Sequence, residues 1–568
     1  MQTSAPRRIG PFILDEHPAR LPAMIGKRDA SRHKVVIAGG GPVGLACALA
    51  LANWGITSVV LEADTTVCDG SRAICISRRS LQILQRHDAL DAHLDKGLPW
   101  LGGRTFHRER EILHFTMPDD KDQKLPPMIN IQQYWIEQFL VEAAARRSGL
   151  IDIRWGTALT GFRQHPDGLE LDARCEATDY QLDADWLIAA DGGQSLLRKQ
   201  LGLKLEGVGW NSKFVIVDVE LPSPYPTERR AWFDPPSNPG LTVLMHRQPD
   251  DLWRIDYQIP DDADMDEALK PANVEAFVQR HLDFTGEGSL PRKTIWISAY
   301  RAGAMTLETY RHGRILFAGN AAHALPIFGV RGLNSGLDDA DNLGWKLAAV
   351  IHGWSDQSLL ASYDAERLHA FRVNAAAAIQ STEFMAPPTP GARLMRDAAL
   401  SLSLAHPAIS QLANPRQTSV ITYENSPLNL PDDAFECGPV PGAALLEAPV
   451  RSADGECHLT DLLGTHWTIL VFSADAWLDP QLDERLRQLQ DKSPPLRTVV
   501  IAAAGRPDGD AYRVLIIDHR RRAAALHGAD SGAVYLVRPD GHVVGRWLRQ
   551  DDPALLEQMR KLPTTLAV

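Results

Sequence analysis

The chain has 568 residues, of which 44% are hydrophobic and 23% are charged. This length predicts about three to four structural units, and the composition excludes a disordered chain or a small disulfide- or metal-stabilised fold. The 59 Lys and Arg against 71 Asp and Glu leave a formal net charge of −12. Because nucleic acids and anionic membranes attract an excess of Lys and Arg, we expect neither as a partner and favour a small molecule.

The cysteines and the N-terminus indicate the cellular setting. Six cysteines are scattered without a Cys-x-x-Cys pair or a Cys/His cluster, a pattern that argues against a metal or dithiol site. The N-terminal segment has no signal-peptide core, and no window approaches the ~18–20 consecutive apolar residues of a membrane span. We therefore expect a cytoplasmic protein with reduced thiols and no metal.

A glycine-rich loop follows the first strongly apolar run of the chain, Val35–Ala38. The run predicts a buried strand, and the residues after the loop predict a helix. Glycines here allow a tight turn and close approach of the backbone to a pyrophosphate. Glu62, 21 residues after Gly41, suits the hydroxyls of an unphosphorylated ribose. This Rossmann-like pattern predicts a site for NAD or FAD, and its cofactor-binding loop residues are Gly39, Gly41, Pro42 and Gly44.

The rest of the chain predicts an α/β protein with an inserted antiparallel sheet. Strands are predicted at 185–190, 214–220, 241–247, 252–259 and 315–318, with a long helix at 333–353. Proline-rich clusters mark later boundaries. The predicted parts are an extension (1–33), a nucleotide-binding domain with an interleaved substrate sheet (34–386, with the sheet at about 100–130 and 205–305), a connecting segment that is linker or helix (387–437) and an α/β domain (438–568).

Three separated motifs carry a family resemblance. They are the glycine loop with Glu62 and the following Ser71-Arg72-Ala73, then Asp191-Gly192-x-x-Ser195-x-x-Arg198, and finally 313–323 continued by Pro326 and Gly332-Leu333-Asn334. Over about 34–385, the chain resembles the single-component FAD-dependent aromatic hydroxylases, the para-hydroxybenzoate and phenol hydroxylase family. The resemblance implies FAD rather than NAD in the glycine loop.

The resemblance also implies which residues meet the cofactor. The second motif would approach the FAD pyrophosphate and the nicotinamide cofactor, and the third would hold the ribityl chain and the pyrimidine ring. A glutamine would sit near the flavin, at Gln133 or at the adjacent Gln132. The implied contacts beyond the glycine loop and Glu62 are Arg72, Gln133, Asp191, Gly192, Arg198, Gly319, Asn320, Pro326, Arg331, Gly332, Leu333 and Asn334.

Two features of the third motif have a physical interpretation. Gly332 precedes the long helix, so free N–H groups there would favour an anionic reduced flavin, and Arg331 would add positive charge. The family usually has Asp where this chain has Asn320. An amide oxygen still accepts a hydrogen bond but without charge assistance, so we expect weaker FAD binding.

Strand 252–259 provides the catalytic candidates. Its residues alternate between apolar and polar, which places Arg254 and Asp256 on one face. In the family this strand supplies an arginine near the flavin, and Arg254 matches it, with His246 and Asp256 as neighbours. The alternative is a solvated strand face with a local Arg–Asp pair. His323 is either a catalytic base or a structural histidine.

The domain after about residue 438 resembles the thioredoxin-like domain of phenol-hydroxylase-type enzymes. Because it lacks Cys-x-x-Cys, we expect a structural or dimer-supporting role and a homodimer.

The resulting prediction is an FAD-dependent monooxygenase that hydroxylates a phenolic ring through a flavin C4a-hydroperoxide, with NADPH or NADH as a transient reductant and O2 as co-substrate. Two alternatives stay open. One is a related flavoenzyme that acts on a larger polyketide or antibiotic, since fold does not set the substrate. The other is a flavin-binding protein without turnover.

Overall fold

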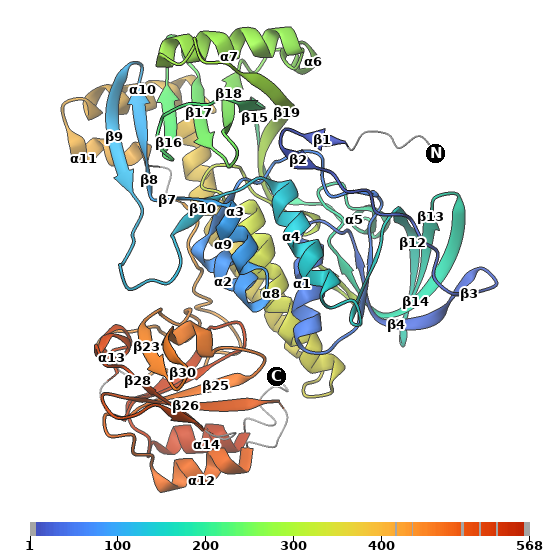
Figure 1. Ribbon diagram of the computed structural model, residues 1–568, viewed down its shortest axis with the longest axis vertical. Coiled ribbons are helices and arrows are strands. Elements are labelled where there is room, and N and C mark those ends of the chain that lie inside the picture. The colour runs from blue at the N-terminus through green and yellow to red at the C-terminus, as the bar shows by residue number, and fades with distance from the viewer. Residues whose placement is uncertain are drawn as a thin grey trace.

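The computed structural model describes residues 7–414, 417–433, 435–489, 494–509, 513–529 and 532–561. Figure 1 shows a nucleotide-binding part on the right, an inserted sheet at the top and a separate C-terminal domain at the lower left. Two long helices, α8 (Gly332–Ile351) and α9 (Leu359–Met385), run through the centre between them. The predicted α/β class with an inserted antiparallel sheet is confirmed.

The nucleotide-binding sheet places the parallel strands β11, β5, β4 and β14 side by side, with β21 also parallel to β14. Its central strand ends in the run Val35–Ala38, which is buried because helices cover both faces of such a sheet. Helix α1 (Pro42–Asn53) connects β4 to β5. The strands are β3 (Met24–Ile25), β4 (Arg28–Ala38), β5 (Ser58–Leu61), β11 (Ile151–Arg154), β12 (Thr157–His165), β13 (Gly168–Cys175), β14 (Thr178–Ala189), β20 (Arg311–His312) and β21 (Ile315–Phe317).

The remaining helices pack around these sheets and fill the connecting segment. Helix α9 continues to Met385, and α10 begins at Pro390, where the fixed backbone of proline suits a first helical turn. The segment 387–437 is therefore helical in its first half. The other helices of the first 413 residues are α2 (Arg78–Arg86), α3 (Leu90–Lys96), α4 (Gln133–Ala145), α5 (Leu196–Gln200), α6 (Met265–Ala268), α7 (Pro271–Thr285), α10 (Pro390–Ser403), α11 (Pro407–Ser410), η1 (Gly319–Ala321) and η2 (Gln411–Ala413).

The N-terminal segment packs against the nucleotide-binding part. Strand β4 begins at Arg28, upstream of the predicted run Val35–Ala38, because its first residues also pair with β14. Arg28 in addition forms an ion pair with Asp183 of β14 at 2.7 Å. Further upstream, the Phe12 ring lies 4.6 Å from Tyr134 and 4.7 Å from Trp135, centroid to centroid. The segment from residue 7 onward thus wraps helix α4, and residues 1–6 of the predicted extension lie outside the described residues.

The inserted sheet has the strand order β22-β19-β15-β18-β17-β16-β8-β9. Strand β18 lies near its middle, and all eight of its residues are buried. On one face Trp253, Ile255 and Tyr257 pack against helix α7. The strands of this sheet, and the three-stranded sheet beside it, are β22 (His323–Ala324), β19 (Lys293–Thr306), β15 (Glu206–Glu220), β18 (Leu252–Ile259), β17 (Thr242–Arg247), β16 (Arg229–Phe233), β8 (Gly102–His107), β9 (Arg110–Thr116), and β6 (Cys75–Ser77), β7 (Leu98–Trp100) and β10 (Met128–Asn130).

The C-terminal domain has its own sheet, in the order β24-β23-β28-β26-β25-β29-β30. Strands β25, β26 and β28 are parallel, β29 is antiparallel to β25, and β30 is antiparallel to β29. The thioredoxin-like assignment stays a prediction. The elements are β23 (Pro449–Ser452), β24 (Gly455–His458), η3 (Leu459–Leu462), β25 (Trp467–Phe472), α12 (Pro480–Leu489), β26 (Leu496–Ala502), β27 (Asp508–Gly509), β28 (Arg513–Ile517), α13 (Arg522–Leu526), β29 (Val534–Val537), β30 (Val543–Trp547) and α14 (Pro553–Lys561).

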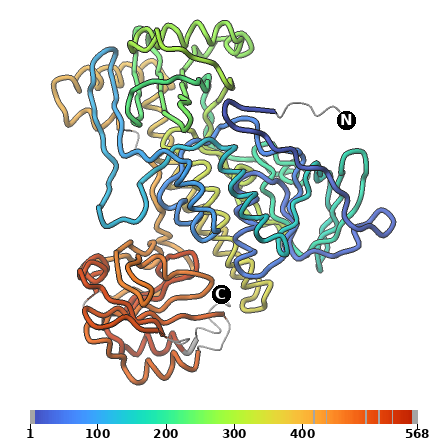
Figure 2. Tube along the Cα trace, viewed as in Figure 1, coloured from blue at the N-terminus to red at the C-terminus, as the bar shows by residue number. Residues whose placement is uncertain are grey.

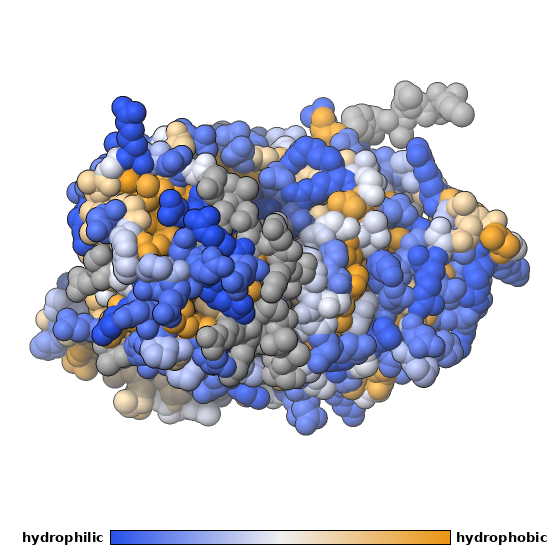
Figure 3. Space-filling view, turned by 90° about the horizontal axis from the view of Figure 1, so that it is seen from below, coloured by the Kyte–Doolittle hydropathy of each residue, from blue (hydrophilic) through white to orange (hydrophobic). Residues whose placement is uncertain are grey.

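The backbone trace in Figure 2 shows that the chain enters the C-terminal domain once, after the central helices. The face seen in Figure 3 is mostly hydrophilic, with small separate groups of hydrophobic residues. Among the described helices, none combines the length and apolar character of a membrane span.

Candidate active site

The glycine loop contains glycines of two kinds. An added Cβ on Gly44 would overlap the carbonyl oxygen of Gly39, and Gly39 itself has φ +101°, a conformation that disfavours side chains. These two are therefore required by the fold of the loop. In contrast, an added Cβ on Gly41 would have nothing within 4 Å. Gly41 directly precedes helix α1, so the free N–H groups of the helix N-terminus lie next to this open space. This open position at a helix N-terminus fits a pyrophosphate.

Glu62 braces the same loop. Its Oε2 accepts a 2.6 Å hydrogen bond from the Gly40 N–H, and its Oε1 accepts one of 2.9 Å from Asp64 N–H. Burial raises the pKa of Glu62. Each carboxylate oxygen has a second lone pair, so the predicted bond to a ribose hydroxyl is compatible with these contacts.

The second and third motifs meet through Arg198. Its guanidinium donates to the carbonyls of Ala321 (3.0 Å), Asn320 (3.4 Å) and Gly193. Gly192 and Gly193 have nothing within 4 Å of an added Cβ. The arginine thus fixes the backbone of two loops around open glycine positions, which is a positioning role for a predicted cofactor residue.

Asp339 organises the loop that contains Gly319. Its Oδ2 accepts from Gly319 N–H at 2.9 Å and pairs with His323 Nε2 at 2.7 Å, while Oδ1 accepts from Arg367. Burial opposes ionisation of Asp339, yet His323 and Arg367 hold its pKa below the usual range. His323 is therefore a structural histidine. The Asn320 side chain is exposed beside this loop.

At the start of α8, one predicted cofactor residue has a fully occupied side chain. Asn334 is buried, and its amide makes four hydrogen bonds within the protein, including one of 2.9 Å from Ser77 N–H. Because these bonds occupy the side chain, only its backbone can face a cofactor. Arg331 is also buried and donates to Phe328 O, whereas Gly332 is open around its Cα. Val330 has φ +53°, a strained conformation for a β-branched residue that often marks a functional loop. The structure places the remaining predicted residues of this motif, Pro326 and Leu333, in and after the same loop.

The loop that contains Arg72 is held from two sides. Gln133 accepts from Ala73 N–H at 3.2 Å and donates to Glu137, so its side chain is occupied within the protein. From the inserted sheet, Arg254 donates to the carbonyls of Arg72 (3.0 Å) and Ser71. The Arg72 side chain itself is exposed.

Arg254 is buried in an ion pair. Its Nε and Nη2 contact the two oxygens of Asp218, each at 2.8 Å, and the Arg254 residue is 2% exposed. The alternative of a solvated strand face is wrong, because neither face of β18 is exposed. An Arg–Asp pair does form, but the partner of Arg254 is Asp218 on the neighbouring strand β15. Arg254 acts here as the clamp between the inserted sheet and the 71–73 loop.

Four strands of the inserted sheet align a row of polar side chains. Asp218 pairs in register with Arg254, which pairs with His246 on β17. Arg229 of β16 lies beside His246, since its neighbour Arg230 pairs with Met245. Burial lowers the pKa of His246 well below its usual value, and the two arginines lower it further. His246 is therefore neutral.

We call this side of the inserted sheet, with the buried polar side chains of Arg229, His246, Gln248, Asp256 and Gln258, the sheet face. Burial raises the pKa of Asp256 to about 7, which the nearby arginines only partly offset. Buried polar atoms are normally satisfied, and those without partners indicate a ligand or water. Several atoms here have no hydrogen-bond partner within the described chain, namely Arg229 Nε, His246 Nδ1, both amide atoms of Gln248, Asp256 Oδ1 and Gln258 Oε1.

Arg229 was not among the predicted site residues. The signal was present, because Arg229-Arg230 begins an otherwise apolar strand and successive strand residues point to opposite faces. Arg230 pairs with Glu287 on the α7 side at 2.7 Å. Arg229 therefore belongs to the opposite side, the sheet face, where it is 5% exposed.

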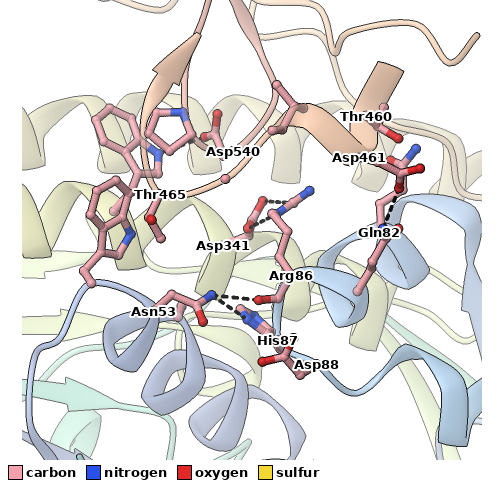
Figure 4. A pocket seen from close by; sticks show the side chains of 17 residues that line it. Asn53, Gln82, Arg86, His87, Asp88, Asp341, Thr460, Asp461, Thr465 and Asp540 are labelled. Atoms are coloured by element: carbon pink, nitrogen blue, oxygen red, sulfur yellow. Dashed lines mark hydrogen bonds and ion pairs between the residues drawn. The ribbon is translucent and has the colours of Figure 1, made fainter. Parts of the chain in front are cut away.

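A cavity of 380 Å³ lies elsewhere, between the C-terminal domain and helices α1, α2 and α8 (Figure 4). It borders the end of α1, a helix whose 12 residues span about 18 Å from the glycine loop. Two polar pairs line it: Arg86 Nη2 lies 2.6 Å from Asp341 Oδ2, and Gln85 donates to Asp461 at 2.7 Å. This cavity belongs to the domain interface.

Comparison with known protein families shows which family the chain belongs to. Residues 32–378 match the FAD binding domain family. The chain belongs to this family. Residues 442–562 match the family described as the HcaD C-terminal domain. The open glycine positions at the N-terminus of α1 and in the 191–193 loop agree with FAD as the bound group.

Two relatives illustrate the range of the family. The chain is 26% identical over 536 residues to the 3-(3-hydroxy-phenyl)propionate/3-hydroxycinnamic acid hydroxylase of Mycobacterium sp. (strain JLS), covering 93% of this chain and 91% of that protein. It is 30% identical over 345 residues to the rifampicin monooxygenase of Streptomyces venezuelae, covering 59% of this chain and 67% of that protein.

Solved structures confirm the fold. The flavin-dependent monooxygenase PieE, in complex with FAD and substrate, superposes with a TM-score of 0.80 at 21% identity over 94% of this chain and 98% of that one. Aklavinone-11 hydroxylase, with FAD and aklavinone, gives 0.73 at 21% identity over the same shares, 94% and 98%. With the sequence relatives, the predicted class of FAD-dependent monooxygenase is confirmed.

Proposed function

We propose that this flavoenzyme hydroxylates an activated, phenolic ring, with NADPH or NADH as reductant and O2 as oxygen donor. The observation that carries the proposal is the sheet face: buried polar atoms without partners lie next to Arg254, which clamps the cofactor loop 71–73. Relatives that match more than nine-tenths of the chain are named as hydroxylases of hydroxyphenyl acids.

The residues divide the work. The glycine positions, Arg198 and the start of α8 would hold FAD, which when bound supplies the electron transfer and O2 activation. Arg254 keeps the 71–73 loop in place, and the surrounding apolar core excludes water.

Asp256 is the proton acceptor for the substrate hydroxyl in this proposal. Its Oδ1 is buried without a partner, and burial raises its pKa to about 7. A base with a pKa near the working pH transfers protons efficiently. Loss of the phenolic proton makes the ring more electron-rich, which favours its attack on an electrophilic oxygen.

Two alternatives are tested by the same experiment. Similarity to rifampicin monooxygenase and the fold of aklavinone-11 hydroxylase favour a larger substrate, and Asn320 at the cofactor loop favours a flavin-binding protein without turnover.

The experiment measures NAD(P)H oxidation and product mass with the purified FAD-loaded protein over monocyclic phenols and polycyclic aromatic compounds. We expect a product 16 mass units above a monocyclic phenol, because one oxygen atom is inserted. Products from polycyclic compounds alone would favour the first alternative. NAD(P)H oxidation that forms only hydrogen peroxide with every compound would contradict hydroxylation.

A further inference from the structure

Arg229 is a buried cation without an anion. Its side chain lies on the sheet face, and it makes no hydrogen bond or ion pair with any residue that the structure describes. Burial lowers the pKa of Arg229 to about 10, and Cys75 and Asp256 are the groups that oppose this shift. A guanidinium with this pKa still carries its proton at neutral pH. Burying a charge without a partner costs several kcal/mol, so such a group is rarely retained without a ligand.

The local charges do not compensate Arg229. Asp218 is used by Arg254 in a two-point ion pair. His246, which lies between the two arginines, is neutral because burial holds its pKa far below neutrality. Asp256 has a pKa of about 7 and is only partly ionised at neutral pH. The sheet face therefore has a net positive charge, and a bound anion would balance it.

We propose that Arg229 binds the carboxylate of the substrate and that this enzyme acts on phenols with an acidic side chain. The inference rests on the proposed function and specifies its substrate class. Guanidinium and carboxylate form two parallel hydrogen bonds, a geometry that a neutral phenol cannot provide.

The position of Arg229 suits one end of a small molecule. Arg229 lies on β16 and Asp256 on β18, with β17 between them. Asp256 pairs with Leu244, two residues along β17 from the His246 that lies beside Arg229. Neighbouring strands are about 4.8 Å apart and two residues rise about 6.8 Å along a strand, so the two residues lie roughly 12 Å apart across the sheet. That span fits one aromatic ring with a short acid side chain. The carboxylate would bind at Arg229, and the hydroxyl would approach Asp256.

Binding measurements on the FAD-loaded protein test the inference. The probes are 3-(3-hydroxyphenyl)propionate, its uncharged amide, and 3-phenylpropionate, which has the carboxylate but no hydroxyl. Dissociation constants come from titration calorimetry and from the change in flavin absorbance. The variants are Arg229→Met, which keeps the length and removes the charge, and Arg229→Lys. Arg104→Met is the control, since this arginine of the adjacent strand β8 pairs with Glu228 and Glu111.

We expect the wild type to bind the acid more tightly than the amide, and Arg229→Met to weaken acid binding about 10- to 100-fold while leaving the amide unchanged. Arg229→Lys should restore part of the difference, because it keeps the charge but loses the planar pair of donors. Arg104→Met should bind like the wild type. FAD content and melting temperature show that each variant is folded.

Three results would overturn the inference. In the first, Arg229→Met loses equal affinity for the acid and the amide, which would assign Arg229 to the ring or its phenolate. In the second, Arg229→Met loses affinity for neither compound, and in the third, the wild type does not bind the acid more tightly than the amide. Failure of the proposed function is distinguishable from these. If 3-phenylpropionate binds to the wild type and about 10- to 100-fold more weakly to Arg229→Met, the carboxylate site stands even when no phenol is hydroxylated.

Discussion

Two regions of the molecule bury charged side chains, and they treat those charges in opposite ways. At the domain interface, Glu366 of α9 pairs with Lys346 of α8 and with Arg538 of the C-terminal domain, each at 2.6 Å. Arg538 also pairs with Asp540 at 2.6 Å. We call these four residues the interface cluster. On the sheet face, by contrast, Arg229 is buried alone.

The difference separates structural from functional burial. Charges of the interface cluster are compensated within the chain, so they fix how α8, α9 and the C-terminal domain pack together and leave nothing to bind. Groups of the sheet face are compensated only if a ligand arrives. Predicted site residues that are already saturated, such as Asn334 and Arg254, therefore act by positioning backbone.

The same contrast exists between two glycines and leads to the largest expected effect. Gly41→Val should abolish FAD retention while the protein stays folded, because its added side chain enters open space at the pyrophosphate position. Gly44→Val should disrupt the loop itself, since the space is filled by Gly39. FAD absorbance of the purified protein and circular dichroism separate the two results. A Gly41→Val protein that is still yellow, and therefore still contains FAD, would show that the pyrophosphate does not bind at this position.

Breaking the interface cluster should cost stability. Glu366→Gln leaves Lys346 without an anion and Arg538 with only one, so we expect the apparent free energy of unfolding to fall by about 3–5 kcal/mol. Thermal and urea unfolding of the FAD-loaded protein measure this. Arg229→Met is the matched control: it also removes one buried charge, but no partner is orphaned, so stability should be unchanged or higher. If both variants lost the same free energy of unfolding, the two regions would not differ in how their buried charges are compensated.

The raised pKa of Asp256 leads to a stability difference between the wild type and Asp256→Asn that depends on pH. Its folded pKa of about 7 exceeds the unfolded value of about 3.9, so the folded state retains the proton between these values. Wild-type stability should therefore fall, relative to Asp256→Asn, as the pH rises from about 4 to 7, and the difference should reach up to about 4 kcal/mol above that. Melting temperatures of both proteins at pH 5 and pH 8 provide the check.

The control for this prediction is Asp218→Asn. It removes the partner of Arg254 and should destabilise the protein at both pH values. A wild-type-minus-variant difference for Asp256 that does not change with pH would place the carboxyl in a solvated environment.

The smallest expected effect concerns Asn320. Asn320→Asp should tighten FAD binding by about 1 kcal/mol, because a carboxylate accepts a charge-assisted hydrogen bond where the amide accepts a neutral one. The dissociation constant of FAD from the reconstituted apoprotein measures the change. Unchanged or weaker binding would show that this exposed side chain does not meet the ribityl chain.

Local patterns predicted a large part of the architecture. The strand and the helix on either side of the glycine loop, and strand β18, appear where the apolar run, glycine spacing and alternation predicted them. These features depend on residues close together in the chain, whose periodicity is visible in one sequence. The homodimer and the cytoplasmic location stay predictions.

The sequence by itself determined the cofactor class, because the glycine loop predicts a dinucleotide site and the family resemblance carried by the three motifs implies FAD. Only the tertiary structure decided which polar residues are free to act. Arg254 finds its anion 36 residues away, and Glu366 meets Arg538 across 172 residues. Arg229 finds no anion at all within the described chain. Compensation of a buried charge depends on long-range packing, so an arginine that braces a loop and one that awaits a ligand look alike until the chain is folded.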